Sequence, residues 1–312
     1  MVEELYLTAF GNRWDEAAAN RLRDEVDRAD RMGMRAHVFA KSGDSNLAAY
    51  NALYGLGCRD PEWSGFEWLE PTMRRYRETG LPPGDGPADQ VSPPGNRTPW
   101  NSFSRRSAAA YCGIIGDYLI EPSSRFADEP GWQPDPECGP DESVLECEIR
   151  LTKPRFVFIN LGTNGSSYGM NGRETAEEVG ELIDEIRRLG PVPIPMTIPV
   201  QLDGHGKKGR WDFAKDASEW MVKIATEKGA PIFDQWSMLA DSRMINHGMI
   251  DFDGKIYDGF HLETIGGFRS TDALQRGVDF SPEALLYGTN MRNLLMLRTL
   301  HTLDSALTPS SE

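Results

Sequence analysis

The sequence predicts an α/β fold in which helices cover both faces of a central parallel β-sheet, and three observations lead to this class. Short apolar runs typical of buried strands alternate along the chain with segments of helical spacing. Glycines and small polar residues follow directly after several of these runs, where an open parallel sheet gathers its functional loops. The 312 residues lie near the upper limit for one hydrophobic core, so we expect one elaborated domain.

The amino-terminal third predicts one long helix, two short strands and the start of a second helix. An apolar stripe at helical spacing ends at Gly33, and the next apolar run ends in a tight turn. We expect residues 1–34 to be an extension packed on a domain of residues 35–312. The predicted elements are a helix over 12–33, a strand over 35–40, a helix starting at 47–49 and a strand over 107–111.

Two long segments rich in Gly, Pro and Trp interrupt this pattern, at residues 56–104 and 122–140. Their composition discourages long regular elements, so we interpret them as loop insertions over the domain. Loops of this length in a compact domain are often functional or form lids.

The rest of the chain repeats the strand and helix alternation more clearly. Residues 155–161 give the clearest prediction of a buried strand in the sequence. The predicted order is a helix over 142–152, that strand, a helix over 174–189, a strand over 193–200, a helix over 211–228, a strand over 231–234 and a docking helix over 282–303.

Composition and charge exclude several classes of partner. The formal net charge of −15 disfavours nucleic acid, because phosphate binding needs a dense Lys and Arg surface. No apolar run approaches the roughly 20 residues that span a bilayer, so we expect a water-soluble protein. The first five residues lack the basic start and apolar core of a secretory signal. Secretion or a periplasmic location after signal removal stays open, and so does the oligomeric state.

The four cysteines show no metal-type pair spacing. Cys58, Cys112, Cys138 and Cys147 could form two disulfides, for which three pairings are possible. They could equally remain buried free thiols. Cys138 with Cys147 is the pair to examine first, because a loop leading into a helix brings them together. The histidines also lack metal-ligand spacing, so we expect neither a metal nor another cofactor.

Four short motifs fall in loops of the predicted sheet. Gly43-Asp44-Ser45 follows the first strand, Gly113 follows the second, and Gly162-Thr163-Asn164 follows the third. Asp258-Gly259-Phe260-His261 comes much later, before the last helix. Ligands of open parallel sheets bind beyond the carboxyl ends of the strands, which favours a shared site for these motifs.

In order and spacing these motifs resemble the blocks of the SGNH (GDSL-like) hydrolase family, over residues 35–303. The resemblance implies a three-layer, flavodoxin-like fold and an esterase with Ser45 as nucleophile and Asp258 and His261 completing a triad. It also implies an oxyanion hole formed by the backbone N–H groups of Ser45 and Gly113 and the side-chain amide of Asn164.

The chemistry agrees with these roles. A hydroxyl is a poor nucleophile near neutral pH, so Ser45 needs His261 as a base, and Asp258 would orient the imidazole. Ester hydrolysis also develops negative charge on the carbonyl oxygen, which preorganised N–H donors stabilise. The sequence departs from the family pattern at Asn46, where Leu or Ile is usual, and at Gly165, where Asp is frequent; neither residue supplies an assigned catalytic atom.

Other interpretations stay open at this point. Ser45 alone would also fit a helix N-cap, and Gly116 is an alternative glycine for the second block. Gly165-Ser166-Ser167-Tyr168-Gly169 matches the Gly-x-Ser-x-Gly elbow of α/β-hydrolases, which would make Ser167 the nucleophile with the same Asp and His. A non-catalytic carbohydrate-binding protein with this fold is a further alternative.

As substrates we expect short acyl esters, such as O-acetyl groups on carbohydrate, because tryptophans of the long loops can stack on sugars.

Overall fold

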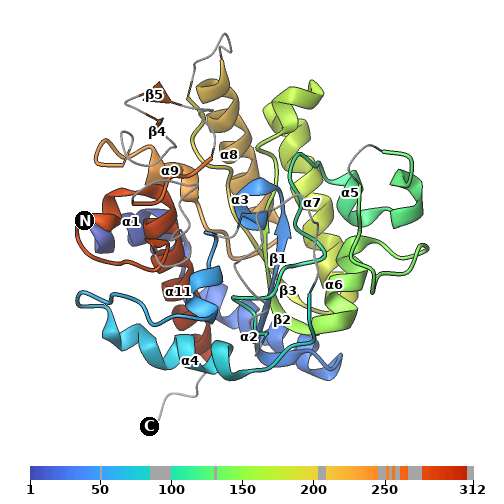
Figure 1. The fold of residues 1–312 in the computed structure, drawn as a ribbon, viewed down its shortest axis with the longest axis horizontal. Helices are drawn as coiled ribbons and strands as arrows, with labels where there is room; N and C mark the ends of the chain where they lie inside the picture. The colour runs from blue at the N-terminus through green and yellow to red at the C-terminus, as the bar shows by residue number, and fades with distance from the viewer. Residues whose placement is uncertain are drawn as a thin grey trace.

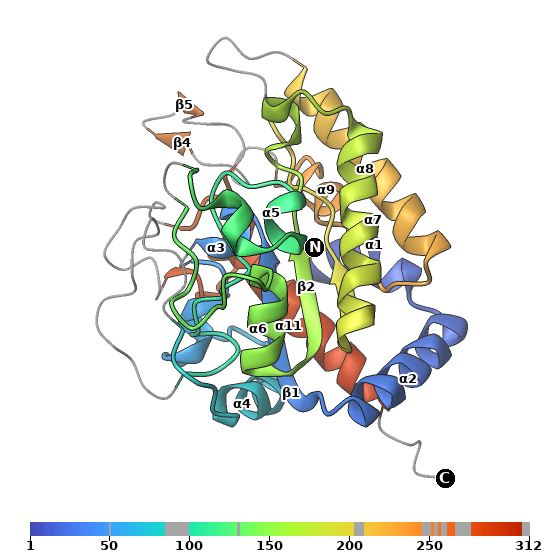
Figure 2. The same ribbon diagram turned by 90° about the vertical axis from the view of Figure 1, so that its right-hand side faces the viewer.

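A computed structural model gives the fold of the chain (Figures 1 and 2). The structure describes residues 1–49, 51–84, 100–129, 132–202, 209–244, 251–252, 255–256, 261–265 and 276–307.

Three parallel strands form the centre of the molecule. They are β1 (Arg35–Gly43), β2 (Pro154–Asn160) and β3 (Val192–Pro195), in the spatial order β1-β2-β3. Single parallel bridges extend the sheet at both edges, from Gly43 to Ala110 and from Met196 to Phe233. Numbered along the chain, the five segments therefore lie in the order 2-1-3-4-5, the flavodoxin-like order.

Two predicted strands are reduced to these single bridges. At residues 107–111 the backbone N–H of Ala108 donates to the Glu148 carboxylate, and that of Ala109 donates to Ser107 Oγ. These side-chain acceptors take the place of ladder partners. At residues 231–234, Pro231 has no N–H to donate and the N–H of Asp234 donates to Ala9 instead. The strand predicted over 193–200 ends at Pro195.

The sheet separates two apolar clusters, which gives three layers. Alternate residues of β2 point to opposite faces, with Phe156 and Phe158 in one cluster and Val157 and Ile159 in the other. The first cluster is covered by α1 (Val2–Ala9), α2 (Glu16–Arg31), α4 (Glu70–Glu78), α9 (Gln235–Leu239) and α11 (Gly288–Leu307). The second is covered by α6 (Val144–Thr152), α7 (Gly172–Leu189) and α8 (Arg210–Glu227). In Figure 1, α1 and α11 lie on one side of the strands and α6 and α7 on the other.

The remaining regular elements are short. They are the helices α3 (Ser45–Ala48) and α5 (Asp117–Ile120), the hairpin of β4 (Asp251–Phe252) and β5 (Lys255–Ile256), and the 3₁₀ turns η1 (Gly11–Arg13), η2 (Tyr54–Gly57), η3 (Glu67–Leu69), η4 (Ser123–Phe126), η5 (Gly165–Tyr168) and η6 (Ala284–Leu286).

Among the described helices, four lie where no helix was predicted: the short α5 and α9, and the longer α1 and α4. The two longer ones show why. The first is α1, which buries Leu5 and Tyr6 in the first cluster, and Tyr6 Oη lies 2.5 Å from Thr302 Oγ1 on α11. The second is α4, which lies within the segment expected to be loop and buries Met73 and Tyr76. Cys138 and Cys147 are joined by a disulfide that ties the second long loop to α6.

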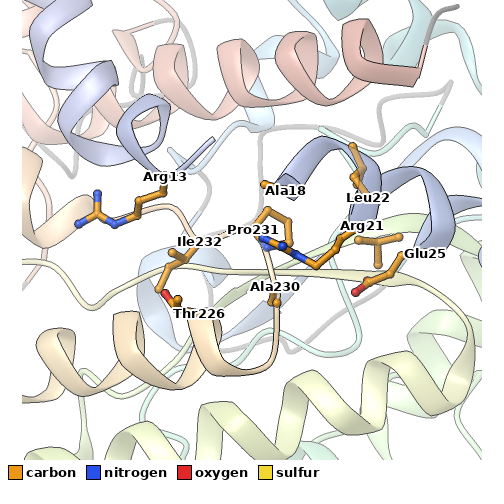
Figure 3. A pocket seen from close by; sticks show the side chains of 11 residues that line it. Arg13, Ala18, Arg21, Leu22, Glu25, Thr226, Ala230, Pro231 and Ile232 are labelled. Carbon is orange, nitrogen blue, oxygen red and sulfur yellow. The ribbon is translucent and has the colours of Figure 1, made fainter. Parts of the chain in front are cut away.

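A small pocket lies at the opposite end of the sheet from Ser45 and His261. It is formed between α2 and the segment that follows α8, and Figure 3 shows the Arg21 side chain of α2 reaching toward Pro231. Val192, the first residue of β3, lines its wall, whereas Ser45 follows the carboxyl end of β1. Among the described residues, no helix combines the length and apolar character that a membrane crossing requires.

Candidate active site

The turn after β1 presents Ser45 as the first residue of α3. Figure 1 shows α3 at the end of β1. The side chain of Asp44 caps this helix by accepting from the backbone N–H of Asn46 at 3.1 Å. Because Asp44 does the capping, the hydroxyl of Ser45 is available for other partners. The N-cap interpretation of Ser45 is therefore wrong for this structure.

Gly43 brings the turn against β2. Its φ is +143°, and a Cβ at this position would lie 1.9 Å from the carbonyl oxygen of Asn160. The N–H of Asp44 donates to that same carbonyl at 2.9 Å, and Gly43 also exchanges backbone hydrogen bonds with Ala109 and Tyr111 at 2.9 Å each. Only glycine allows this approach of three backbone segments.

Asp44 also joins the first motif to the third. It is fully buried, and its second carboxylate oxygen accepts from the backbone N–H of Thr163 at 3.1 Å. The side chain of Thr163 in turn accepts from the Asn46 amide at 3.2 Å. Burial raises the pKa of the Asp44 carboxyl, against the opposing effects of these hydrogen bonds and of His261 nearby. The loops after β1 and β2 thus form one buried unit.

The structure brings Ser45 and His261 together from positions 216 residues apart. His261 Nε2 lies 2.8 Å from Ser45 Oγ, and the Ser45 side chain is almost buried, with 5% of its surface exposed. The segment carrying the histidine is attached to the start of α11, where Thr289 donates to the carbonyls of Glu263 and Leu262 at 2.9 and 3.2 Å. Asp258 lies outside the described residues.

Arg292 is a buried residue of the site that the sequence reasoning missed. It belongs to α11, is 1% exposed, and donates from Nη1 to the carbonyl of Asn46 on α3 at 2.8 Å. Burial lowers its pKa to about 10, and the charge of Asp44 opposes that shift. One signal in the sequence was available, since an arginine within the apolar run of the last helix must have a buried partner.

Asn164 and Gly113 lie in adjoining loops at the same edge of the sheet. Asn164 Nδ2 donates to the carbonyl of Ile114 at 3.2 Å, which links the loop after β2 to the residues following Gly113. Gly113 is exposed and has a φ of +78°. The N–H of Gly116, the alternative glycine, donates to Glu178 at 3.1 Å. Gly116 is thus already engaged by a side chain of α7.

The segment around Ser167 has a different geometry from a nucleophile elbow. That motif needs a strand running directly into the turn and a helix running directly out of it. Here β2 ends at Asn160, Ser167 lies exposed within the 3₁₀ turn η5, and α7 begins only at Gly172.

One group of potential metal ligands is found among the described residues. It consists of Cys138, Glu142 and Cys147, and its two sulfur atoms are joined in the disulfide. These cysteines are therefore not available as thiolate ligands.

A family model matches most of the chain. It describes the GDSL-like lipase/acylhydrolase family and covers residues 43–266, a range that includes all five residues assigned from the motifs. A search of proteins with curated functions finds no match.

Several solved structures resemble this chain at low sequence identity. A lipase/acylhydrolase from Enterococcus faecalis is 14% identical, with 88% of this chain and 98% of that chain covered and a TM-score of 0.47. A native aryl esterase of M. smegmatis is 12% identical, with coverages of 86% and 100% and a TM-score of 0.45. A carbohydrate esterase of family 3 from Talaromyces cellulolyticus is 10% identical, with coverages of 85% and 98% and a TM-score of 0.46.

Proposed function

The chain belongs to the GDSL-like lipase/acylhydrolase family and is an SGNH-type carboxylic ester hydrolase, and from this premise we propose that it acts through an acyl-enzyme formed on Ser45. The observation that carries the proposal is the 2.8 Å distance between Ser45 Oγ and His261 Nε2. This separation is within the hydrogen-bond range that a serine nucleophile and its general base require.

The proposed reaction has two halves. Ser45 Oγ attacks the ester carbonyl while His261 takes its proton, and the tetrahedral intermediate then collapses as His261 returns the proton to the departing alcohol. Water next attacks the acyl-enzyme with His261 again as base, and the second intermediate releases the carboxylic acid and restores Ser45. Asp258, assigned from the Asp-x-x-His spacing, would hold the imidazole in the required orientation.

Both intermediates carry an oxyanion that must be stabilised. We assign the donors as the backbone N–H groups of Ser45 and Gly113 and the side-chain amide of Asn164. The Asn164 amide has two N–H bonds, and one of them donates to Ile114, so the second is the one assigned to the oxyanion. The loss of one such donor typically costs about 3–4 kcal/mol of transition-state stabilisation.

A fluorophosphonate probe tests the nucleophile directly. We expect rapid inactivation with one phosphonyl group on the peptide that contains Ser45, measured by peptide mass spectrometry, because only an activated serine reacts quickly. The Ser167→Ala variant is the matched control and should label like the native chain. Labelling at Ser167 would instead support the elbow alternative, and no labelling at all would support the non-catalytic carbohydrate-binding alternative.

We further propose short acyl esters as substrates, with O-acetyl groups on carbohydrate as the leading class. Four aromatic side chains, those of Tyr111, Tyr118, Phe126 and Trp132, gather beside the segment that contains Gly113. Trp132 stacks on Tyr111 with ring centroids 4.7 Å apart, and Tyr118 stacks on Phe126 at 4.2 Å. Aromatic faces of this kind suit the apolar faces of sugar rings.

A panel of esters tests this preference. We expect kcat/KM to be highest for acetyl esters and to fall from butyryl to long-chain acyl groups, with acetate released from acetylated polysaccharide. The measurements are initial rates with matched nitrophenyl esters and acetate assays on the polymer. Equal or faster turnover of long-chain esters would contradict the substrate assignment and leave the serine mechanism intact.

A further inference from the structure

Side chains, rather than a regular backbone ladder, hold the segment of residues 113–116. The carbonyl of Gly113 accepts from Tyr168 Oη at 2.8 Å, and the carbonyl of Ile114 accepts from Asn164 Nδ2 at 3.2 Å. The N–H of Gly116 donates to Glu178 Oε2 at 3.1 Å. These groups belong to three consecutive peptide units, so each unit after Gly113 is held by a different side chain.

All three side chains come from one short stretch that is itself well anchored. Asn164 and Tyr168 bound the turn η5, in which the N–H of Ser167 donates to the carbonyl of Asn164 at 2.8 Å. Glu178 lies on α7, whose first turn is closed by a reciprocal capping box between Asn171 and Glu174. In Figures 1 and 2, α5, which begins just after the 113–116 segment, lies beside α7.

Gly113 needs such support. It has a φ of +78°, and an added Cβ would meet no atom within 4 Å, so packing does not restrain this residue. An oxyanion donor is effective only when it is fixed before the charge develops. The peptide that carries the Gly113 N–H directly precedes the three peptide units held by side chains. The fixed orientation of those three units limits the rotation of the peptide before them.

We propose that Tyr168 and Glu178 are positioning residues that fix the Gly113 N–H for the oxyanion. This inference rests on the proposed function, because it takes Gly113 to be one of the donors. Neither side chain needs to contact the substrate in this role. Tyr168 acts through the carbonyl of Gly113, and Glu178 acts through the N–H of Gly116.

The Tyr168→Phe variant tests the first contact. It removes only the hydroxyl, and the loss of one hydrogen bond of roughly 0.5–1.5 kcal/mol predicts a fall in kcat of about 3- to 10-fold. KM should stay within about twofold of the native value, because the interaction acts mainly on the tetrahedral intermediates. Ser166→Ala is the control: it removes an exposed hydroxyl from the same turn η5, for which the described residues show no hydrogen bond, and its kcat should match the native value.

A boronic acid inhibitor separates positioning from general damage to the fold. Its adduct with Ser45 is tetrahedral and places an oxygen in the oxyanion hole, so its inhibition constant should rise by the same factor as kcat falls. Thermal unfolding of Tyr168→Phe should remain close to that of the native chain, since the phenol is half exposed. A kcat/KM and a boronate affinity equal to the native values would overturn the role of Tyr168.

The second contact is tested through pH. Burial raises the pKa of Glu178 to about 7, and the negative charges of Asp117 on α5 and Glu181 on α7 add to the shift. The carboxyl is therefore ionised above pH 7 and neutral below it. The ionised form accepts the stronger hydrogen bond from Gly116. Glu178→Gln imitates the neutral form and keeps an acceptor oxygen.

The ratio of native to Glu178→Gln kcat should accordingly rise from about one at pH 6 to roughly threefold at pH 8.5. The ratio cancels the pH dependence that both proteins share. Glu178→Ala, which has no acceptor, should lose activity at both pH values. Glu177→Gln, which removes a carboxylate of α7 that pairs with Arg173, should follow the native profile. A flat ratio together with an active Glu178→Ala would overturn the role of Glu178.

The two levels of the proposal fail in different ways. If the fluorophosphonate probe does not label Ser45, the proposed function fails. If Ser45 is labelled and the Tyr168 and Glu178 variants still behave like the native chain, the positioning role alone fails.

Discussion

Replacing Ser45 with alanine is expected to lower kcat/KM for a reactive acetyl ester by roughly 10⁴- to 10⁶-fold. The change removes one oxygen atom from a side chain that is 5% exposed, and it leaves the backbone of α3 in place. The nucleophile would be lost, while the oxyanion donors and the binding surface would remain and give a small residual rate. Initial rates at high enzyme concentration measure the effect.

Two comparisons establish the cause of that loss. His261→Ala should cost a similar factor, and the Ser45→Ala/His261→Ala double variant should be hardly worse than either single variant, because the two groups act as a unit. Ser167→Ala should retain native activity. A Ser45→Ala protein that keeps more than about a tenth of the native rate, with native thermal unfolding, would refute the assignment of the nucleophile.

Much of the sheet could be predicted because its strands carry a strong local signal. The run from Phe156 to Ile159 is apolar throughout, as a strand buried on both faces must be. The edge segments at 107–111 and 231–234 were harder to predict. Their backbone groups bond to Glu148, Ser107 and Ala9, and no periodicity in the sequence contains that information.

The helices show the same division between local and tertiary signals. Residues 172–189 combine an amphipathic pattern with a capping box, and the predicted helix over 174–189 differs from α7 by two residues at its start. By contrast, α4 lies in a stretch rich in Gly, Pro and Trp, and packing of Met73 and Tyr76 on the first cluster stabilises it. Tertiary packing here outweighs local propensity.

The candidate site could be predicted from short motifs, but its supporting residues could not. Ser45 and His261 were named from the sequence, and the structure places their reactive atoms within hydrogen-bond distance. Arg292 and Glu178 belong to no motif, and Tyr168 is only a variable residue of the Gly-x-Ser-x-Gly match. The roles of all three depend on which loops are neighbours in space. A single sequence does not specify those neighbours until the order of the strands is known.

Replacing Gly43 with alanine should be the most damaging small substitution in the fold. The new Cβ would lie 1.9 Å from the carbonyl oxygen of Asn160 and 2.6 Å from its carbon, and both are backbone atoms of the central strand. Relief would require β1 and β2 to separate, which breaks the 2.9 Å hydrogen bond from Asp44 to Asn160. We expect a loss of more than about 4 kcal/mol in the free energy of unfolding, seen as little soluble folded protein by circular dichroism.

Gly33→Ala provides the matched comparison for this prediction. Gly33 also has a left-handed φ, +81°, but an added Cβ there meets nothing within 4 Å, so only backbone strain of roughly 1–2 kcal/mol is expected. Denaturant unfolding of the two variants therefore separates the clash from the strain. If Gly43→Ala were as stable as Gly33→Ala, the tight contact between the Ser45 turn and β2 would be wrong. The assignment of Asp44 and Thr163 to one buried unit would then also be wrong, because the same contact brings the loops after β1 and β2 together.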